Sequence, residues 1–118
     1  MSEKWMLLIA EDPAEQKDLP ESFWREHDRR HREFRAAVEA AGGTVVESEP
    51  LSERAVTMRP GKDGSMLVTD GPFAESKEVV LGFYLLEVAD ATQARELAAL
   101  CPTLGSLELR QVMHPKER

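Results

Sequence analysis

The residues with the clearest chemical potential are a histidine and an aspartate that lie far apart in the chain. His31 falls on the inward stripe of a predicted helix, and Asp70 ends a predicted strand at the turn formed by residues 70–73. A carboxylate that accepts a hydrogen bond from one imidazole nitrogen fixes the tautomer and leaves the other nitrogen as a base or acid. The alternatives are a turn-forming aspartate and a histidine at the edge of the core, because only the fold can join the two residues.

A second histidine, His27, precedes His31 by one helical turn. This spacing puts two imidazoles on one helix face, which is an arrangement that zinc sites use. A catalytic zinc site needs a third ligand, and the adjacent Asp28 points away from that face. We therefore predict no metal site and no cofactor.

Three further side chains are candidates for ligand binding. Phe73, in the turn, and Trp24, near the start of the helix, are expected to form an apolar wall. Arg110 alternates with apolar residues on the last predicted strand. It either binds an anion or pairs with Glu108 or Glu87, and an ion pair is the simpler interpretation.

The elements that must position these residues alternate between strand and helix. Segment 11–19 is polar and is predicted as a loop. Two helices for five or six strands predict an α+β fold, with both helices on one face of a mainly antiparallel sheet. The order fits the ferredoxin-like (split βαβ) topology with an extra β-hairpin. The predicted order is strand 4–10, helix 19–41, strand 44–48, hairpin 55–59 with 65–69, strand 79–88, a helix from Asp90 to Cys101, and strand 107–113.

The length of 118 residues predicts a single domain over 1–118, with a loose tail at 114–118. One face of the sheet would lack cover from the helices. In a chain this small a second subunit often supplies that cover, so we expect a homodimer.

The charge balance argues against nucleic acid as a partner. The chain carries 15 Lys and Arg against 22 Asp and Glu, for a net charge of -7. The basic cluster at residues 25–35 is interleaved with acidic residues, which indicates a solvated helix face with ion pairs. The single cysteine, Cys101, falls at an apolar helix position and is interpreted as a core residue. A lone thiol and the absence of a signal-like or membrane-spanning run predict a cytoplasmic protein with no membrane partner.

Residues 70–78 read Asp-Gly-Pro-Phe-Ala-Glu-Ser-Lys-Glu and resemble the signature of the DGPF branch of the YCII-related family. The resemblance extends over nearly the whole chain. The matching segment after the second strand tends to read Glu-Gly-Leu in that family, and here it is Glu49-Pro50-Leu51. Proline fixes φ and lacks an N–H, so a pocket beside that loop would differ in shape. Further similar segments are Trp5–Ile9, His31–Phe34, Ala40–Gly42, Gly82–Leu85 and Leu107–Arg110.

This resemblance implies a ferredoxin-like protein that dimerises through its sheet, with a His–Asp pair in a pocket as the site of any activity. It also implies a link to extracytoplasmic-function sigma factors. Two hypotheses follow. The first is a small-molecule-binding homodimer, with weak enzymatic activity through His31 and Asp70 as its extension. The second is a non-catalytic interaction or regulatory protein linked to such a sigma factor, for which the acidic charge would suit a basic partner.

Overall fold

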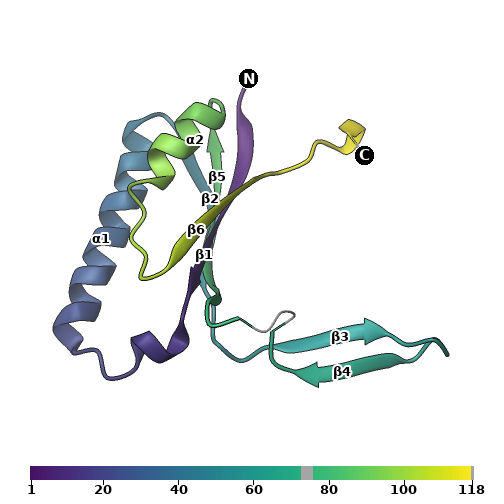
Figure 1. Cartoon of the computed structure of the whole chain (residues 1–118). Helices are drawn as coiled ribbons and strands as arrows, with labels where there is room; N and C mark the ends of the chain where they lie inside the picture. The colour runs from purple at the N-terminus through teal and green to yellow at the C-terminus, as the bar shows by residue number, and fades with distance from the viewer. Residues whose placement is uncertain (73–75, 118) are drawn as a thin grey trace.

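The computed structural model describes residues 1–72 and 76–117. Four strands form the main sheet, and two form a separate hairpin (Figure 1). The main-sheet strands are β1 (Glu3–Glu11), β2 (Thr44–Pro50), β5 (Val79–Val88) and β6 (Ser106–Gln111). The hairpin consists of β3 (Val56–Pro60) and β4 (Met66–Asp70), and the helices are α1 (Glu21–Ala40) and α2 (Ala91–Ala98). Two short 3-10 helices, η1 (Pro13–Gln16) and η2 (Pro115–Glu117), complete the described elements.

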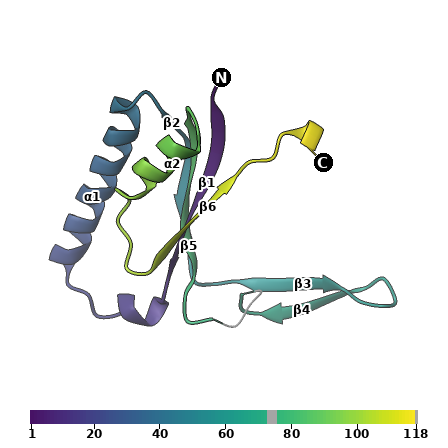
Figure 2. The ribbon, with the colours of Figure 1, turned by 45° about the horizontal axis from the view of Figure 1, so that its top comes forward.

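The strand order in the main sheet is β2-β5-β1-β6, and every neighbouring pair is antiparallel. Strands β1 and β2, which flank α1 in the sequence, are separated in the sheet by β5. Both helices lie on the same side of the sheet (Figure 2). The predicted mixed α+β fold with two helices and an antiparallel sheet is therefore confirmed, and the strand order is compatible with the predicted split βαβ topology.

The core lies between the two helices and the sheet. Alternation along β1 and β5 turns every second residue toward the helices, and the helical period of α1 supplies the opposing surface. The largest fully buried side chains are Phe34, Leu7, Leu86, Val38 and Val88. Cys101 is also buried in this core, as the sequence predicted.

The ends of the helices follow local rules of capping. Gly42 has a φ of 87° just after α1, a conformation that glycine adopts at low cost. Asp90 caps α2, because its side chain accepts a hydrogen bond from the backbone N–H of Gln93.

The segment from 11 to 19 differs from its prediction as a loop. Strand β1 extends to Glu11, and residues 13–16 form η1. A register shift between Ile9 and Ala10 in the pairing with β5 lets the strand continue past its apolar run. The strand thereby carries the Glu11 carboxylate to a buried position, where only 5% of the residue is exposed.

Candidate functional site

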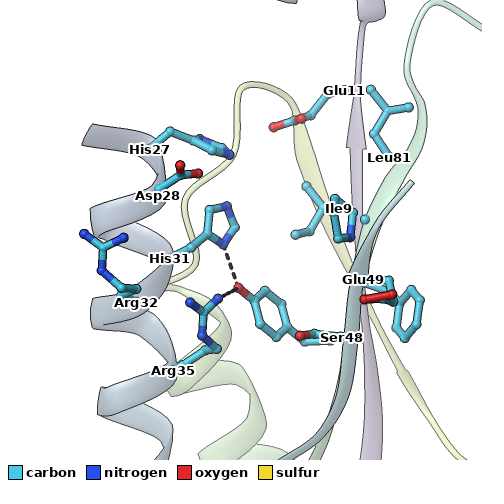
Figure 3. A pocket seen from close by; sticks show the side chains of 14 residues that line it. Ile9, Glu11, His27, Asp28, His31, Arg32, Arg35, Ser48, Glu49 and Leu81 are labelled. Atoms are coloured by element: carbon cyan, nitrogen blue, oxygen red, sulfur yellow. Dashed lines mark hydrogen bonds between the residues drawn. The ribbon is translucent and has the colours of Figure 1, made fainter. Parts of the chain in front are cut away.

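A cavity of about 340 Å³ opens between α1 and the ends of β1, β2 and β5. This volume lies at the small end of the range of roughly 300–1,000 Å³ that ligand sites occupy. The side chains of the α1 wall are polar or charged, and apolar residues contribute to the sheet side (Figure 3). The α1 wall consists of His27, Asp28, His31, Arg32 and Arg35, and the apolar side of Ile9, Pro50, Leu81 and Phe83.

The central interaction of the cavity joins α1 to β5. Nδ1 of His31 lies 2.7 Å from the hydroxyl oxygen of Tyr84, and Nη1 of Arg35 donates a hydrogen bond of 3.2 Å to the same oxygen (Figure 3). The Phe34 ring packs edge-on against the Tyr84 ring, with a centroid distance of 4.8 Å. The tyrosine is therefore held on one side by the core and on the other by two polar side chains.

The surroundings of His31 favour its neutral form. Burial lowers the pKa of His31 to about 4, and the nearby His27 and Arg35 act in the same direction. The Glu11 and Asp28 carboxylates oppose this shift in pKa without overcoming it. At neutral pH the imidazole is therefore uncharged, with one ring nitrogen as donor and the other as acceptor.

The hydrogen bonds around Tyr84 indicate which nitrogen carries the proton. Arg35 can only donate, so it occupies a lone pair of the Tyr84 oxygen. Within the described residues, the Tyr84 hydroxyl has no hydrogen-bond partner besides His31 and Arg35. The hydroxyl proton of Tyr84 has an acceptor if Tyr84 donates a hydrogen bond to Nδ1 of His31. The imidazole proton then lies on Nε2. Burial also raises the pKa of Tyr84, partly offset by Arg35, so the phenol keeps this proton at neutral pH.

Glu11 supplies a fixed carboxylate beside the histidines. One oxygen accepts from the backbone N–H of Leu104 at 2.8 Å and from the Thr103 hydroxyl at 3.3 Å, and the other accepts from Nε2 of Gln16 at 2.5 Å. Three donors, one from η1 and two from the loop at 103–104, thus hold one buried carboxylate in place.

A row of ring contacts continues from this cavity along α1. His31 lies edge-on to His27 with a centroid distance of 4.5 Å, and His27 contacts both Trp24 at 5.3 Å and Phe23 at 5.8 Å. Trp24 is thus the neighbour of a cavity residue, but it does not itself line the cavity. Phe23, His27 and His31 belong to the helix stripe predicted to face inward, and all three are partly buried.

The structure does not bring Asp70 to this cavity within one chain. Asp70 ends β4, pairs with Val56 in the hairpin and is exposed. Among the described residues no contact joins it to His31, whose Nδ1 is taken by Tyr84. Phe73 lies outside the described residues. Arg110 is exposed on β6 and pairs with Glu108 at 2.5 Å, which is the ion pair favoured from the sequence.

Three residues that line the cavity were missed by the sequence analysis, namely Tyr84, Arg35 and Glu11. Tyr84 was recognised only as part of an apolar strand, although period-2 alternation places it on the same face as Leu86 and Val88. Arg35 follows His31 by four residues and therefore shares its helix face. No sequence pattern indicated that Glu11 is buried, because an acidic residue after an apolar run is typical of a loop.

The cavity also contains the position where the chain departs from the family pattern. Both Glu49 and Pro50 line it, at the end of β2. Pro50 therefore forms part of the cavity wall. The sequence analysis expected a different pocket shape if this loop bordered a pocket, and it does.

Neither a metal-binding cluster nor a reactive thiol is present in the described part of the chain. There, no group of three or more His, Cys, Asp or Glu residues is arranged to hold a metal ion. Burial raises the pKa of Cys101 to about 12, with a further contribution from Glu11, so its thiol stays protonated and unreactive. No helix in residues 1–72 and 76–117 has the length and apolar character needed to cross a membrane.

Comparison with known proteins agrees with this architecture. The family model for the YCII-related domain matches residues 4–115, so the chain belongs to the YCII-related family. A protein of Rhizobium meliloti (strain 1021), named Uncharacterized protein R00369, is 42% identical over 72 residues. The match covers 58% of this chain and 56% of that relative, so the chain spans little more than half of the relative's length.

Proposed function

We propose that this protein binds a small molecule in the cavity between α1 and the sheet, with His31 as the central polar group. The observation that carries the proposal is the hydrogen bond of 2.7 Å between Nδ1 of His31 and the Tyr84 hydroxyl, at the wall of that cavity. A histidine whose one nitrogen is fixed presents its other nitrogen in a defined direction. This arrangement lets an imidazole recognise a ligand through a directed hydrogen bond.

The protonation state suggests what His31 does to the ligand. A histidine with a pKa of about 4 is a weak base at neutral pH. Its Nε2–H is instead a hydrogen-bond donor, suited to a carbonyl, hydroxyl or carboxylate oxygen of the ligand. Arg32 and Arg35, on the same helix face, add positive charge to that wall, whereas Ile9 and Leu81 offer an apolar surface opposite. We therefore expect a ligand with an oxygen-bearing polar end and an apolar end.

Enzymatic activity would use the same groups. In that case the Nε2–H of His31 donates a hydrogen bond to a substrate oxygen that gains negative charge during the reaction, and the Tyr84 hydroxyl, hydrogen-bonded to Nδ1, holds the imidazole in place. Tyr84 takes the orienting role that the sequence analysis gave to Asp70. The His31–Asp70 pair stays a prediction from the family resemblance, as do ligand contacts from Trp24, Phe73 and Arg110.

We further propose that the protein is a cytoplasmic homodimer of ferredoxin-like fold in the DGPF branch of its family. The support is the strand order, the resemblance of residues 70–78 and the sheet face that the helices leave open. A regulatory role linked to an extracytoplasmic-function sigma factor is the second candidate. It is favoured by the net charge of -7 and by the exposed apolar residues of the hairpin.

Binding can be tested by titrating a set of small carbonyl and carboxylate compounds into ¹⁵N-labelled protein. The proposal predicts shifts centred on His31, Gly82 and Tyr84. Gly82→Ala, which adds a methyl group at the cavity wall, should weaken the binding, and Leu67→Ala on the hairpin is the control. Compounds that perturb only residues outside the cavity, or bind equally well to Gly82→Ala, would argue against it. Co-purification with a sigma factor, without ligand binding in the cavity, would favour the second candidate.

A further inference from the structure

One charged side chain of the cavity lining is buried. Only 5% of Glu11 is exposed, whereas the other charged side chains that line the cavity in the described chain are exposed or half-buried. Water and salt screen exposed charges strongly and buried charges much less. The charge of Glu11 therefore acts on a ligand with less screening than the charges of its neighbours. These neighbours are Asp28, Arg32, Arg35 and Glu49.

The hydrogen bonds of Glu11 leave room for one more donor. An ionised carboxylate accepts hydrogen bonds at about four lone-pair sites, which are shared equally by its oxygens. Oε2 accepts from the Leu104 backbone N–H and from the Thr103 hydroxyl, so both of its sites are used. Oε1 accepts from Nε2 of Gln16, and no second donor reaches it among the described residues. Oε1 is therefore the oxygen with which Glu11 can accept a hydrogen bond from a ligand.

Glu11 and His31 face the same cavity from opposite walls. Figure 3 shows the Glu11 carboxylate pointing from β1 toward α1, and the His31 imidazole pointing from α1 toward the sheet. Burial lowers the pKa of His31, and among the groups that oppose this shift Glu11 acts more strongly than Asp28, which lies on the same helix as His31. The charge of Glu11 thus reaches His31 across the cavity. Since Tyr84 occupies Nδ1 of His31, the nitrogen left for a ligand is Nε2.

We propose that Glu11 determines the specificity of this cavity, and that it selects a neutral ligand with an amide-type group. The carbonyl oxygen of such a group accepts from Nε2–H of His31, and its N–H donates to Oε1 of Glu11. A primary amide carries both on one edge. A carboxylate ligand is disfavoured, because its charge would lie beside a buried charge of the same sign. The inference rests on the ligand binding proposed above and names the class of ligand.

A matched set of small compounds tests the ligand class on the wild-type protein. Benzamide, acetophenone and benzoate share a phenyl ring and a carbonyl-type oxygen. They differ in the group beside that oxygen, which is an N–H₂ group, a methyl group or a second, charge-sharing oxygen. Titration of ¹⁵N-labelled protein gives the Kd of each compound. We expect benzamide to bind about tenfold more tightly than acetophenone, because acetophenone cannot donate a hydrogen bond to Glu11. Benzoate should also bind more weakly than benzamide.

A variant and a direct signal assign the preference to Glu11. Glu11→Gln keeps the size of the side chain but replaces a carboxylate oxygen by an N–H₂ group, so the preference for benzamide over acetophenone should disappear. Glu15→Gln removes the same charge at an exposed position of η1 outside the cavity, and should keep the preference of wild type. The ¹³C signal of the Glu11 carboxyl group needs no variant. In wild type it should move on addition of benzamide and stay in place with acetophenone.

The outcomes separate this inference from the proposed function. Equal binding of benzamide and acetophenone, with shifts at His31 and Gly82, would overturn the role of Glu11 and leave ligand binding in the cavity intact. Tighter binding of benzoate than of benzamide would do the same. A preference for benzamide that persists in Glu11→Gln would show that another group recognises the N–H, and would also overturn the inference. No shift in the cavity with any of the three compounds would overturn both proposals.

Discussion

The hydroxyl of Tyr84 on β5 and Nδ1 of His31 on α1 lie 2.7 Å apart, across 53 positions of sequence. This contact joins the helix to the sheet at the wall of the cavity and orients the imidazole. Since Arg35 donates to the same oxygen, the contact is part of a three-residue network. The network gives the cavity its defined polar group.

Tyr84→Phe should destabilise the protein by about 1–2 kcal/mol, because one hydroxyl serves both His31 and Arg35. Urea denaturation, followed by circular dichroism, measures the free energy of unfolding. Arg35→Ala removes the second donor but leaves the His31 contact, and is the comparison. If the phenylalanine variant were as stable as wild type, the network would have no net energetic role.

Stability should fall as the pH drops from about 6.5 to about 4. His31 has a pKa of about 4 in the folded chain against an ordinary value of 6.5, so the unfolded chain binds its proton first as the pH falls. Between these values protonation favours unfolding, and above 6.5 the contribution is fully present. The shift corresponds to about 1–2 kcal/mol after discounting for the partial exposure of the ring. His31→Gln should flatten this part of the curve of unfolding free energy against pH, and an unchanged curve would contradict the assignment.

Glu11→Gln should cost about 2–3 kcal/mol in unfolding free energy. The amide places an N–H₂ group among the donors Gln16, Thr103 and the Leu104 backbone, so one donor loses its acceptor. Glu15→Gln, at an exposed position in η1, is the matched control and should be nearly neutral. Equal stability of the two variants would show that the buried carboxylate is not needed to hold the loop at 103–104.

Two glycines near the cavity should respond differently to alanine. A Cβ at Gly105 would overlap the Ala10 carbonyl oxygen, whereas a Cβ at Gly82 meets nothing closer than 3.6 Å. Gly105→Ala should therefore cost about 2–3 kcal/mol through overpacking, and Gly82→Ala should keep the fold. Thermal unfolding of both variants checks this contrast. A stable Gly105→Ala would mean that the chain beside Ala10 shifts freely.

Local patterns in the sequence predicted much of this fold but only half of the site. The helical period of α1 was sufficient to point His31 inward, and alternation predicted the β3–β4 hairpin. Tyr84 could not be paired with His31, because that contact depends on which strand lies under the helix. The position of Glu11 at the buried end of β1 was not predicted, because it depends on the register shift between Ile9 and Ala10, and no sequence pattern indicates that shift. Asp70 was correctly placed at a turn, but no local signal says in which direction the hairpin leaves the sheet.

The most direct test of the site is ¹⁵N NMR of the His31 imidazole as a function of pH. We expect a neutral ring with its proton on Nε2 from pH 5.5 to 8, and a pKa of about 4. Tyr84→Phe should change the ring shifts, and Asp70→Asn should leave them unchanged. A His31 that titrates near its ordinary value of about 6.5, or one that responds to Asp70→Asn and not to Tyr84→Phe, would contradict the central role of the His31–Tyr84 contact.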